Sequence, residues 1–348
     1  MKARIKGLHI DSIISWLPHD SLDLTSLSSE YGETEISKII KATGIGRVRI
    51  ASPGMTSSDM CQKAAEELIL REGIDRESID GLVFVSQTAD WILPSTSVAL
   101  QNRLGLSSKT ICIDIHYGCS GYIYGLLQAA SWISIGACER VLVLAGDTSS
   151  KMVNIHDRSL RMVFGDAGTA TLVSKGSFEM GFTIFSDGSG YDRLIVPAGG
   201  FRLPYSADTS ILEWDKEHAG RTKNDMFMDG MAIFKFAMSK VPGSIRSILE
   251  YMQWDKEDVN LYAIHQANKF IVDQIRKHLK VDISKVPVNV MDYGNTGPAT
   301  IPLLLSDYCA GKTLPLEKVV MSGFGVGLSW GCVATNMCDT RFYEPVNK

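Results

Sequence analysis

Short unbroken apolar runs alternate along this chain with longer stretches in which apolar residues recur at helical spacing. In the first half, the short runs predict buried strands at 81–86, 111–115, 140–146 and 170–174. The stretches between them predict helices at 60–70, 94–104 and 120–135. Near-continuous apolar strands between helices indicate a sheet that is covered on both faces. We therefore expect an α/β fold.

The second half of the chain repeats this order. Helical spacing recurs at 227–249, 268–279 and 299–310, and strand-like runs recur at 261–265, 286–292, 318–322 and 330–337. A chain of 348 residues exceeds the usual size of one hydrophobic core, so we expect two similar halves, 1–175 and 176–348. The stretch 199–223 has mixed charge and no periodicity, which favours an insertion loop between the halves.

Composition and charge argue against several classes of protein. The net charge of −4 disfavours nucleic acid as a partner, because proteins that bind it usually carry a basic excess. No apolar run approaches the roughly 18 residues that a membrane span needs. The seven cysteines include no C-x-x-C pair, which argues against a disulfide framework and a cysteine zinc site. We expect a cytoplasmic protein that holds no metal ion and binds neither nucleic acid nor a membrane.

Cys119 lies in a glycine-flanked segment, Tyr117–Gly121, between a predicted strand and a predicted helix. Unpaired N–H groups and the helix macrodipole favour an anion at such a helix N-terminus. This setting can lower the pKa of a cysteine below its free value of about 8.5 and so favour the reactive thiolate. The alternative is a small buried apolar residue, which most free cysteines are. The local setting leaves both interpretations open.

Two further strand-to-helix junctions carry candidate partners for Cys119. His265 ends the apolar run 261–265, and Asn295 lies between an extended run and a predicted helix. A lone histidine at such a junction is more often a hydrogen-bonded structural residue, and the sequence around Asn295 also suits a turn. Functional side chains of α/β proteins gather where strands end. The three residues are therefore expected to meet at one edge of the sheet.

The glycine-rich segment Gly323–Gly327 follows the predicted strand 318–322. A dinucleotide-binding loop would need a helix after it, whereas a strand-like run follows here at 330. We interpret the segment as a loop whose exposed N–H groups line an oxyanion hole. Asp166 also lies among glycines, and a hydrogen bond to a turn is the favoured interpretation there.

Five ordered motifs resemble those of β-ketoacyl-acyl-carrier-protein synthase III, and the resemblance covers essentially the whole chain. They lie at 114–121, 164–170, 265–268, 294–296 and 324–331. The resemblance implies a thiolase fold, in which two similar halves stack as five αβαβα layers, and a homodimer. It assigns Cys119, in the N-terminal half, as the nucleophile. His265 and Asn295, in the C-terminal half, would complete the triad.

The activity implied is a decarboxylative Claisen condensation. Cys119 would take an acyl group from a thioester, with the backbone N–H groups of Cys119 and Val326 as oxyanion hole. His265 and Asn295 would bind the carbonyl oxygen of malonyl-acyl carrier protein while carbon dioxide leaves, giving a β-ketoacyl thioester. No cofactor is expected beyond the phosphopantetheine or coenzyme A that carries the substrate. The alternative is a transferase of the same fold that moves the acyl group to an alcohol or amine without decarboxylation.

Several positions depart from the family pattern for coenzyme A. Arg158 matches an arginine that stacks on adenine, but Lys38, Ala42 and Met231 replace a tryptophan, an arginine and an asparagine. These departures favour an acyl carrier protein or another thioester donor over coenzyme A. Lys235, which matches a family lysine, and Lys269 are expected to dock the anionic carrier protein.

The expected acyl pocket differs from the family pattern as well. Leu93 replaces a common phenylalanine, and the bulky pair His116 and Tyr117 replaces small residues near the nucleophile. Val326 interrupts a glycine run in the oxyanion loop. Other residues expected to contact the substrate are Met228 and Phe324. These changes predict a starter acyl group other than acetyl.

Overall fold

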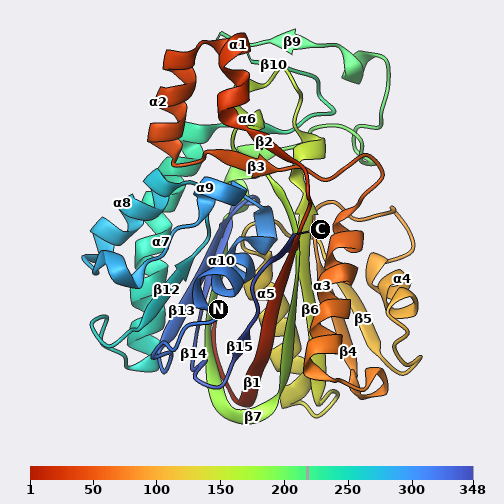
Figure 1. Ribbon diagram of the computed structural model, residues 1–348, viewed down its shortest axis with the longest axis vertical. Coiled ribbons are helices and arrows are strands. Elements are labelled where there is room, and N and C mark those ends of the chain that lie inside the picture. The colour runs from red at the N-terminus through yellow and green to blue at the C-terminus, as the bar shows by residue number, and fades with distance from the viewer. Residues whose placement is uncertain (217–218, 348) are drawn as a thin grey trace.

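A computed structural model describes residues 1–216 and 219–347 of the chain. A ten-stranded mixed sheet runs through it in the order β12-β13-β14-β7-β6-β4-β5, with β1 beside β7 and two short strands, β15 and β16, beside β1 (Figure 1). Its strands are β1 (Lys2–Leu17), β4 (Gly81–Val85), β5 (Ile111–Ile115), β6 (Arg140–Thr148), β7 (Asp166–Ser186), β12 (Leu261–Ile264), β13 (Val319–Gly325), β14 (Ser329–Thr335), β15 (Arg341–Phe342) and β16 (Val346–Asn347).

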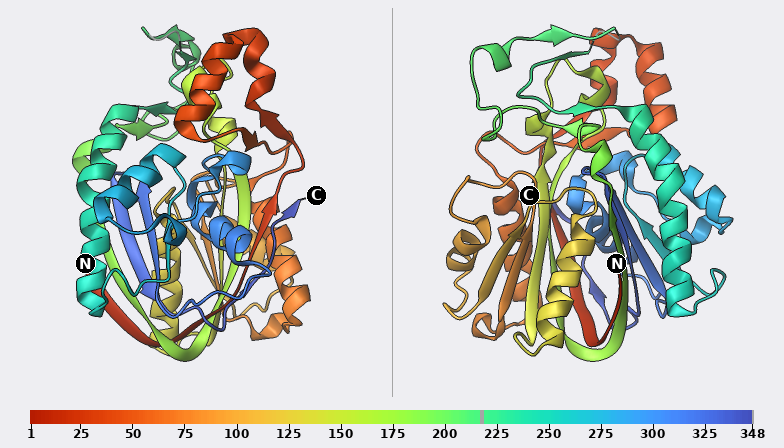
Figure 2. Two further views of the ribbon diagram at one scale, coloured as in Figure 1. Left: turned by 60° about the vertical axis from the view of Figure 1, so that its left-hand side comes forward. Right: turned by 180° about the vertical axis from the view of Figure 1, so that it is seen from behind.

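The sheet is folded over along β1 and β7, its two longest strands. The first part of β7, up to Ser174, pairs with β6, and the part from Met180 onward pairs with β14. β1 runs antiparallel to β7 along most of its length, with register irregularities between Lys6 and Ser12. Figures 1 and 2 show both strands curving at one end of the molecule, so that the two parts of the sheet face each other.

Helices fill the space between the two parts of the sheet and cover both outer faces. Their bounds are α3 (Ser57–Glu72), α4 (Thr96–Arg103), α5 (Gly121–Ser134), α7 (Gly230–Met252), α8 (Lys269–Leu279) and α10 (Thr300–Cys309). α5 and α10 share one core with the inner faces of both parts. α3 packs on the outer face of β4 and β6, and α7 and α8 pack on the outer face of β12 to β14. The five-layered α/β arrangement is confirmed.

Smaller elements cap the end of the layers at which the inner strands finish. They are β2 (Ser21–Asp23), α1 (Ser28–Tyr31), α2 (Glu33–Thr43), β3 (Arg47–Arg49), α6 (Arg158–Arg161), β8 (Leu194–Ile195), β9 (Glu213–Trp214), β10 (Gly220–Arg221), β11 (Phe227–Met228) and α9 (Val290–Tyr293). The predicted loop 199–223 holds only short elements, among them the β9–β10 pair, and its residues 217 and 218 lie outside the described ones.

Two sequence predictions need correction. The run 286–292 is not extended, because a turn of 3-10 helix precedes it and α9 begins at Val290, whose side chain packs in a small core with Ile45 and Val48. The strand predicted at 170–174 is only one piece of β7. Residue 175, at which we divide the chain into halves, lies within that strand, and the division stays a prediction. Across the described residues, no helix combines the length and apolarity that a membrane crossing requires.

Candidate active site

Cys119 lies buried between the end of β5 and the start of α5, with 6% of its surface exposed. The backbone N–H groups of Cys119 itself and of Val326 face its sulfur and favour the thiolate form. Gly325 lets this approach occur, because a Cβ at that position would lie 2.8 Å from the Cβ of Cys119 and 3.0 Å from its sulfur. The β13–β14 turn therefore brings the N–H of Val326 to the thiol, beside the second expected oxyanion donor, the N–H of Cys119 itself.

The pKa of Cys119 is shifted in the direction opposite to the one that the sequence predicted. Burial and, to a smaller extent, the negative charge of Asp147 raise it to about 12, although the two backbone N–H groups act to lower it. The expected lowering at the N-terminus of α5 is wrong for the substrate-free site, because loss of hydration outweighs the favourable N–H groups. The resting site holds a neutral thiol.

His265 directly follows β12, and its backbone N–H donates to the carbonyl of Ser322 on β13 at 2.8 Å. The ring is buried and lies edge-to-face against Phe324, with 5.2 Å between ring centroids. Nδ1 lies 2.6 Å from the hydroxyl oxygen of Thr300 at the start of α10. Burial lowers the pKa of His265 to about 3, so the imidazole is neutral at physiological pH. Because Thr300 occupies Nδ1, Nε2 is the ring nitrogen left for a substrate.

Asn295 lies in the loop between α9 and α10, fixed through its backbone and its side chain. Its N–H donates to the carbonyl of Val163 at 2.8 Å, and its own carbonyl accepts from Gly165 at 3.0 Å. The side-chain oxygen accepts the N–H of Gly297 at 3.1 Å. That contact orients the amide, since a backbone N–H must face the oxygen and not the NH₂ group. The NH₂ group is therefore the free donor.

Contacts through neighbouring residues bring the three predicted residues to one end of β13. Cys119 packs against Gly325, and His265 packs against the adjacent Phe324. The hydroxyl oxygen of Thr300 lies 2.6 Å from Nδ1 of His265 and 3.1 Å from the carbonyl oxygen of Gly297, and Gly297 in turn binds Asn295. The strand ends that the sequence predicted to meet thus lie next to one another.

A cavity of about 1050 Å³ opens beside the sulfur of Cys119. Its wall includes Leu93, which is 78% exposed, and His116. The apolar part of its lining comprises Trp91, Ile92, Met152, Phe164, Leu194, Ile195, Val196 and Met226. A wall of this composition suits an acyl chain.

Other predicted substrate contacts lie away from the cavity wall. Met228 packs in the small core that includes Phe164 and Val326, behind that wall. Phe324 is buried beneath His265. Arg158 is half-buried at the start of α6 and has no ion pair within the described ranges. None of these three lines the cavity.

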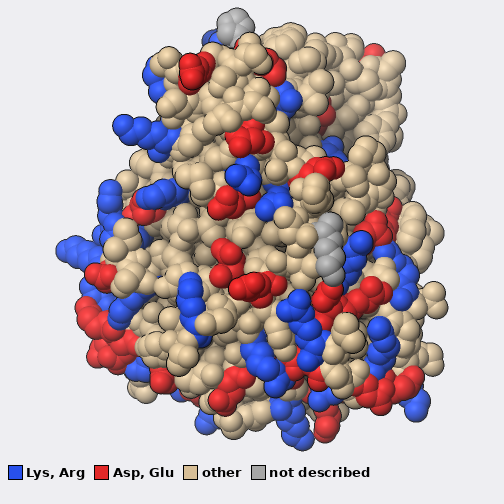
Figure 3. Space-filling model, viewed as in Figure 1, with Lys and Arg blue, Asp and Glu red and all other residues tan. Residues whose placement is uncertain are grey.

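The two lysines predicted to dock a carrier protein are both exposed. Lys235 lies on α7, and Lys269 begins α8, where it pairs with Asp273 one turn later. In Figure 3, Lys and Arg side chains project along the margin at which Figure 1 places α2 and α8. Acidic side chains lie there as well (Figure 3), and the net positive charge that an anionic partner requires comes from α8, where Lys269, Arg276 and Lys277 outnumber Asp273.

Sequence reasoning missed two residues of the site, Thr300 and Asp147. Thr300 occupies the first position of α10, where a hydroxyl residue is ordinary and carries no distinguishing signal. Asp147 stands near the end of the apolar run of β6, and an acid in such a run was a usable signal. It is fully buried, and burial raises its pKa to about 7.

Comparison with known proteins gives a consistent result. Two family models match, 3-oxoacyl-[acyl-carrier-protein (ACP)] synthase III over residues 113–188 and its C-terminal part over residues 249–337. The putative 3-oxoacyl-[acyl-carrier-protein] synthase 3 of Campylobacter jejuni is 34% identical, covering 97% of this chain and 96% of that protein. The β-ketoacyl-[acyl-carrier-protein] synthase III of Clostridioides difficile is 36% identical, covering 91% and 94%. A crystal structure of a 3-oxoacyl-(acyl-carrier protein) synthase from Burkholderia xenovorans superposes with a TM-score of 0.91 at 35% identity, covering 100% of this chain and 99% of that one.

Proposed function

The chain belongs to the β-ketoacyl-acyl-carrier-protein synthase III family, and from this membership we infer that it condenses an acyl group with malonyl-acyl carrier protein, with loss of carbon dioxide. It is a transferase of the condensing class. The observation that carries the residue assignment is the setting of the Cys119 sulfur, on which two backbone N–H groups converge beside a large cavity.

Acyl transfer to Cys119 is the first step that we propose. The sulfur attacks the carbonyl carbon of an acyl thioester, and the thiol of the donor leaves with the proton that Cys119 loses. The N–H groups of Cys119 and Val326 hold the oxygen that becomes negative in the tetrahedral intermediate. Removing one such donor typically costs about two to three orders of magnitude in rate.

Condensation on the acylated enzyme depends on His265 and Asn295. The free Nε2 and NH₂ groups bind the carbonyl oxygen of the malonyl thioester. The bond to the carboxylate breaks, carbon dioxide leaves, and the electron pair enters an enolate whose oxygen the two donors stabilise. The enolate carbon then attacks the acyl carbonyl and displaces the thiolate of Cys119, giving a β-ketoacyl thioester.

Thr300 supports this assignment of donors. The hydroxyl has one proton, and we propose that it is donated to Nδ1 of His265, the nearer of its two neighbours, so that the proton of the neutral ring is on Nε2, which is then a donor. The low pKa of the ring keeps it neutral, so it binds the thioester oxygen without protonating it. The amide of Asn295 needs no protonation at all. Both donors are thus pre-arranged for an enolate.

We also propose a starter acyl group larger than acetyl. The cavity beside Cys119, about 1050 Å³, far exceeds what two carbons occupy, and apolar side chains such as Trp91, Phe164 and Leu194 form part of its wall. A panel of straight and branched acyl thioesters tests this through the rate at which each adds its mass to Cys119. An acetyl thioester that loads fastest would contradict the proposal.

We propose an acyl carrier protein as partner and Lys235 and Lys269 as part of its docking surface. The support is their exposure beside the basic margin of α2 and α8. A homodimer and a cytoplasmic location complete the proposal. The dimer is supported by the apolar edge of β5, and the location by seven cysteines that form no disulfide across the described residues.

Release of carbon dioxide tests the reaction itself. The enzyme is mixed with an acyl thioester and malonyl-acyl carrier protein, and carbon dioxide and the β-ketoacyl product are measured together. We expect equal amounts of both, and loss of both in Asn295→Ala. Acyl transfer to another acceptor without carbon dioxide would contradict the proposed function.

A further inference from the structure

Asp147 presents two differently placed oxygens inside the fold. Oδ1 accepts hydrogen bonds from the hydroxyl of Ser86 at 2.8 Å and the backbone N–H of Gln87 at 2.7 Å. Thr88 adds its N–H at 3.3 Å and its hydroxyl at 3.2 Å. Oδ2 is buried and has no hydrogen-bond partner within the described ranges. One carboxylate oxygen therefore accepts four hydrogen bonds, and the other accepts none.

The bare oxygen faces the catalytic loop. A Cβ on Gly297 would lie 2.8 Å from Oδ2, so only a glycine fits there, and the same Gly297 holds the side chain of Asn295. The cavity that opens beside Cys119 also includes Gly297 and Gln87 in its wall. Asp147 therefore lies against the asparagine loop on one side and, on the other, binds Gln87, whose side chain packs against Gly118 next to Cys119.

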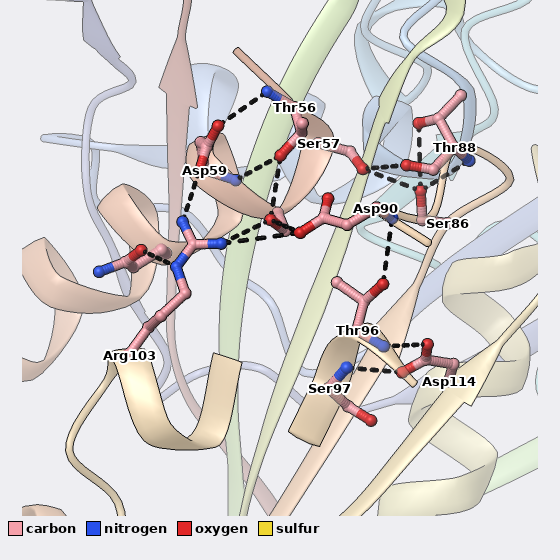
Figure 4. A network of polar contacts seen from close by, with 12 residues as sticks. Thr56, Ser57, Asp59, Ser86, Thr88, Asp90, Thr96, Ser97, Arg103 and Asp114 are labelled. Atoms are coloured by element: carbon pink, nitrogen blue, oxygen red, sulfur yellow. Dashed lines mark hydrogen bonds and ion pairs between the residues drawn. The ribbon is translucent and has the colours of Figure 1, made fainter. Parts of the chain in front are cut away.

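A wider polar network keeps the carboxyl from turning away. Ser57 donates to the carbonyl of Thr88 at 2.7 Å, and its hydroxyl oxygen lies 3.2 Å from that of Ser86. Figure 4 shows this network running onward from Ser86 and Thr88 to Asp90 and Arg103. The turn that grips Oδ1 is thus anchored on α3 and α4, and the direction of Oδ2 is fixed.

The fold does not require a charge at this position. An amide oxygen would accept the same four hydrogen bonds, and an unpaired buried carboxylate is costly. No lysine, arginine or histidine hydrogen-bonds to Asp147 in the part of the chain that the structure describes. The carboxyl therefore has a role that an amide would not provide.

We propose that Asp147 is a positioning residue that acts through Cys119. Its carboxylate repels the thiolate of Cys119, whereas its neutral acid form does not. The buried end of the site therefore holds one negative charge at a time. This inference rests on the proposed role of Cys119 as nucleophile. It makes a proton on Asp147 a condition for full reactivity of the thiol. The direction agrees with the charge of Asp147 raising the pKa of Cys119.

The groups around Asp147 limit what else titrates there. Cys61 faces it from α3 and Cys119 from the segment before α5, and burial raises the pKa of both thiols to about 12. Asp166 lies opposite Thr148 on β7 and is held by Ala51 and Ser150. His265 stays neutral, because its pKa is lowered to about 3. Asp147, with a pKa raised to about 7, changes charge between pH 6 and 8, and burial raises the pKa of Asp166 as well.

The test is the pH dependence of alkylation of Cys119 by iodoacetamide, followed on its own peptide by mass spectrometry. Asp147→Asn keeps the acceptor for all four donors and removes the charge. At pH 6 the variant and the natural enzyme should react equally, because Asp147 is then largely neutral. Above pH 8 the variant should react about tenfold faster, which corresponds to one unit of pKa.

Asp166→Asn is the matched control, because it removes a second buried carboxyl that is also held by N–H and hydroxyl donors. Its ratio to the natural enzyme should not change with pH. A constant ratio for Asp147→Asn would overturn the proposal, since a structural effect shifts all rates alike. If that variant fails to fold, the natural enzyme still decides: its rate should flatten near pH 7, and an unbroken rise would refute the inference. Neither readout uses an acyl substrate, so both are independent of the proposed condensation.

Discussion

The hydroxyl of Thr300 decides which nitrogen of His265 can serve the substrate. Thr300→Val removes the hydroxyl at nearly constant shape and frees the ring to exchange its proton between nitrogens. We expect condensation to slow by roughly tenfold to a hundredfold, because a donor to the enolate is lost part of the time. Acylation of Cys119 should change little. Single-turnover measurements of acylation and of carbon dioxide release separate the two steps.

Thr300→Ser is the control for that experiment, because it keeps the hydroxyl and loses only a methyl group. It should retain most of the condensation rate. Equal losses in Thr300→Ser and Thr300→Val would mean that packing, and not the hydrogen bond to Nδ1, is what the position supplies.

The buried ring of His265 should not titrate in the physiological range. Burial lowers its pKa to about 3, so the ring stays neutral as the pH falls from 8 to 5. An ordinary histidine gains a proton near pH 6.5 over the same interval. NMR of the imidazole carbon-bound protons, assigned with His265→Gln, measures this. A His265 signal that shifts with a midpoint near 6.5 would show that the site is wetter than the structure indicates.

At the level of single residues, the sequence was informative where a residue stood at a strand-to-helix junction. Cys119, His265 and Asn295 each do, and the structure places them around one strand end. Thr300 and Asp147 act through contacts between distant segments, with His265 in one case and the turn 86–88 in the other. No local pattern reports such contacts. The predicted lowering of the pKa of Cys119 was wrong for the same reason, because burial is a property of the whole fold.

The close approach of the β13–β14 turn to α5 depends on glycine. Gly325→Ala would place a methyl group 2.8 Å from the Cβ of Cys119, so either the turn or the nucleophile must move. We expect acylation of Cys119 to fall by about a hundredfold, because the N–H of Val326 leaves the oxyanion position. The rate of mass gain on Cys119 with a saturating acyl thioester measures it.

Gly243→Ala is the matched control in α7. It is exposed, and no atom lies within 4 Å of an added Cβ. An alanine inside a helix should raise the free energy of unfolding by about 0.5–1 kcal/mol and leave acylation unchanged. A Gly325→Ala enzyme as active as Gly243→Ala would contradict the assigned role of the turn.

At the level of elements, buried strands and helices were predictable because their apolar pattern is strong. The alternation Lys2-Ala-Arg-Ile-Lys6 was an available signal for β1, whose early residues alternate between exposed and half-buried. The run 286–292 alternates like a strand but has no strand beside it. Gln266 instead accepts the N–H of Asn289 at 3.1 Å, which fixes a turn. Whether such a run becomes a strand depends on a neighbouring strand to pair with, and that neighbour lies far away in the sequence.

At the level of the whole molecule, β5 is an edge strand with apolar side chains in solvent. Ile111 is 40% exposed, and Val98 on the neighbouring α4 is 50% exposed. An uncovered apolar edge favours pairing with another chain. The double variant Ile111→Glu, Val98→Glu should be a monomer, whereas the natural chain should show twice the mass of 38.2 kDa by light scattering after size exclusion.

Ile283→Glu provides the comparison, since Ile283 is 62% exposed but lies beside α8, away from β5. It should remain a dimer. A natural chain that elutes as a monomer, or a double variant that stays dimeric, would exclude β5 as the interface.

The layered architecture could be predicted from the sequence only because five ordered motifs resemble those of a known family. The apolar pattern indicates a sheet covered by helices, but not that β1 and β7 fold that sheet over α5 and α10. That arrangement rests on a long bent strand, β7, which pairs with β6 at one end and β14 at the other. Register between distant strands is a global property.

The reactivity of Cys119 is the claim on which the whole account depends. The measurement is the intact mass of the protein after incubation with an acyl thioester, for the natural chain, Cys119→Ala and Cys338→Ala, in which an exposed thiol is removed. We predict one added acyl group in the natural chain and in Cys338→Ala, and none in Cys119→Ala. Acyl loading that persists in Cys119→Ala would contradict the account.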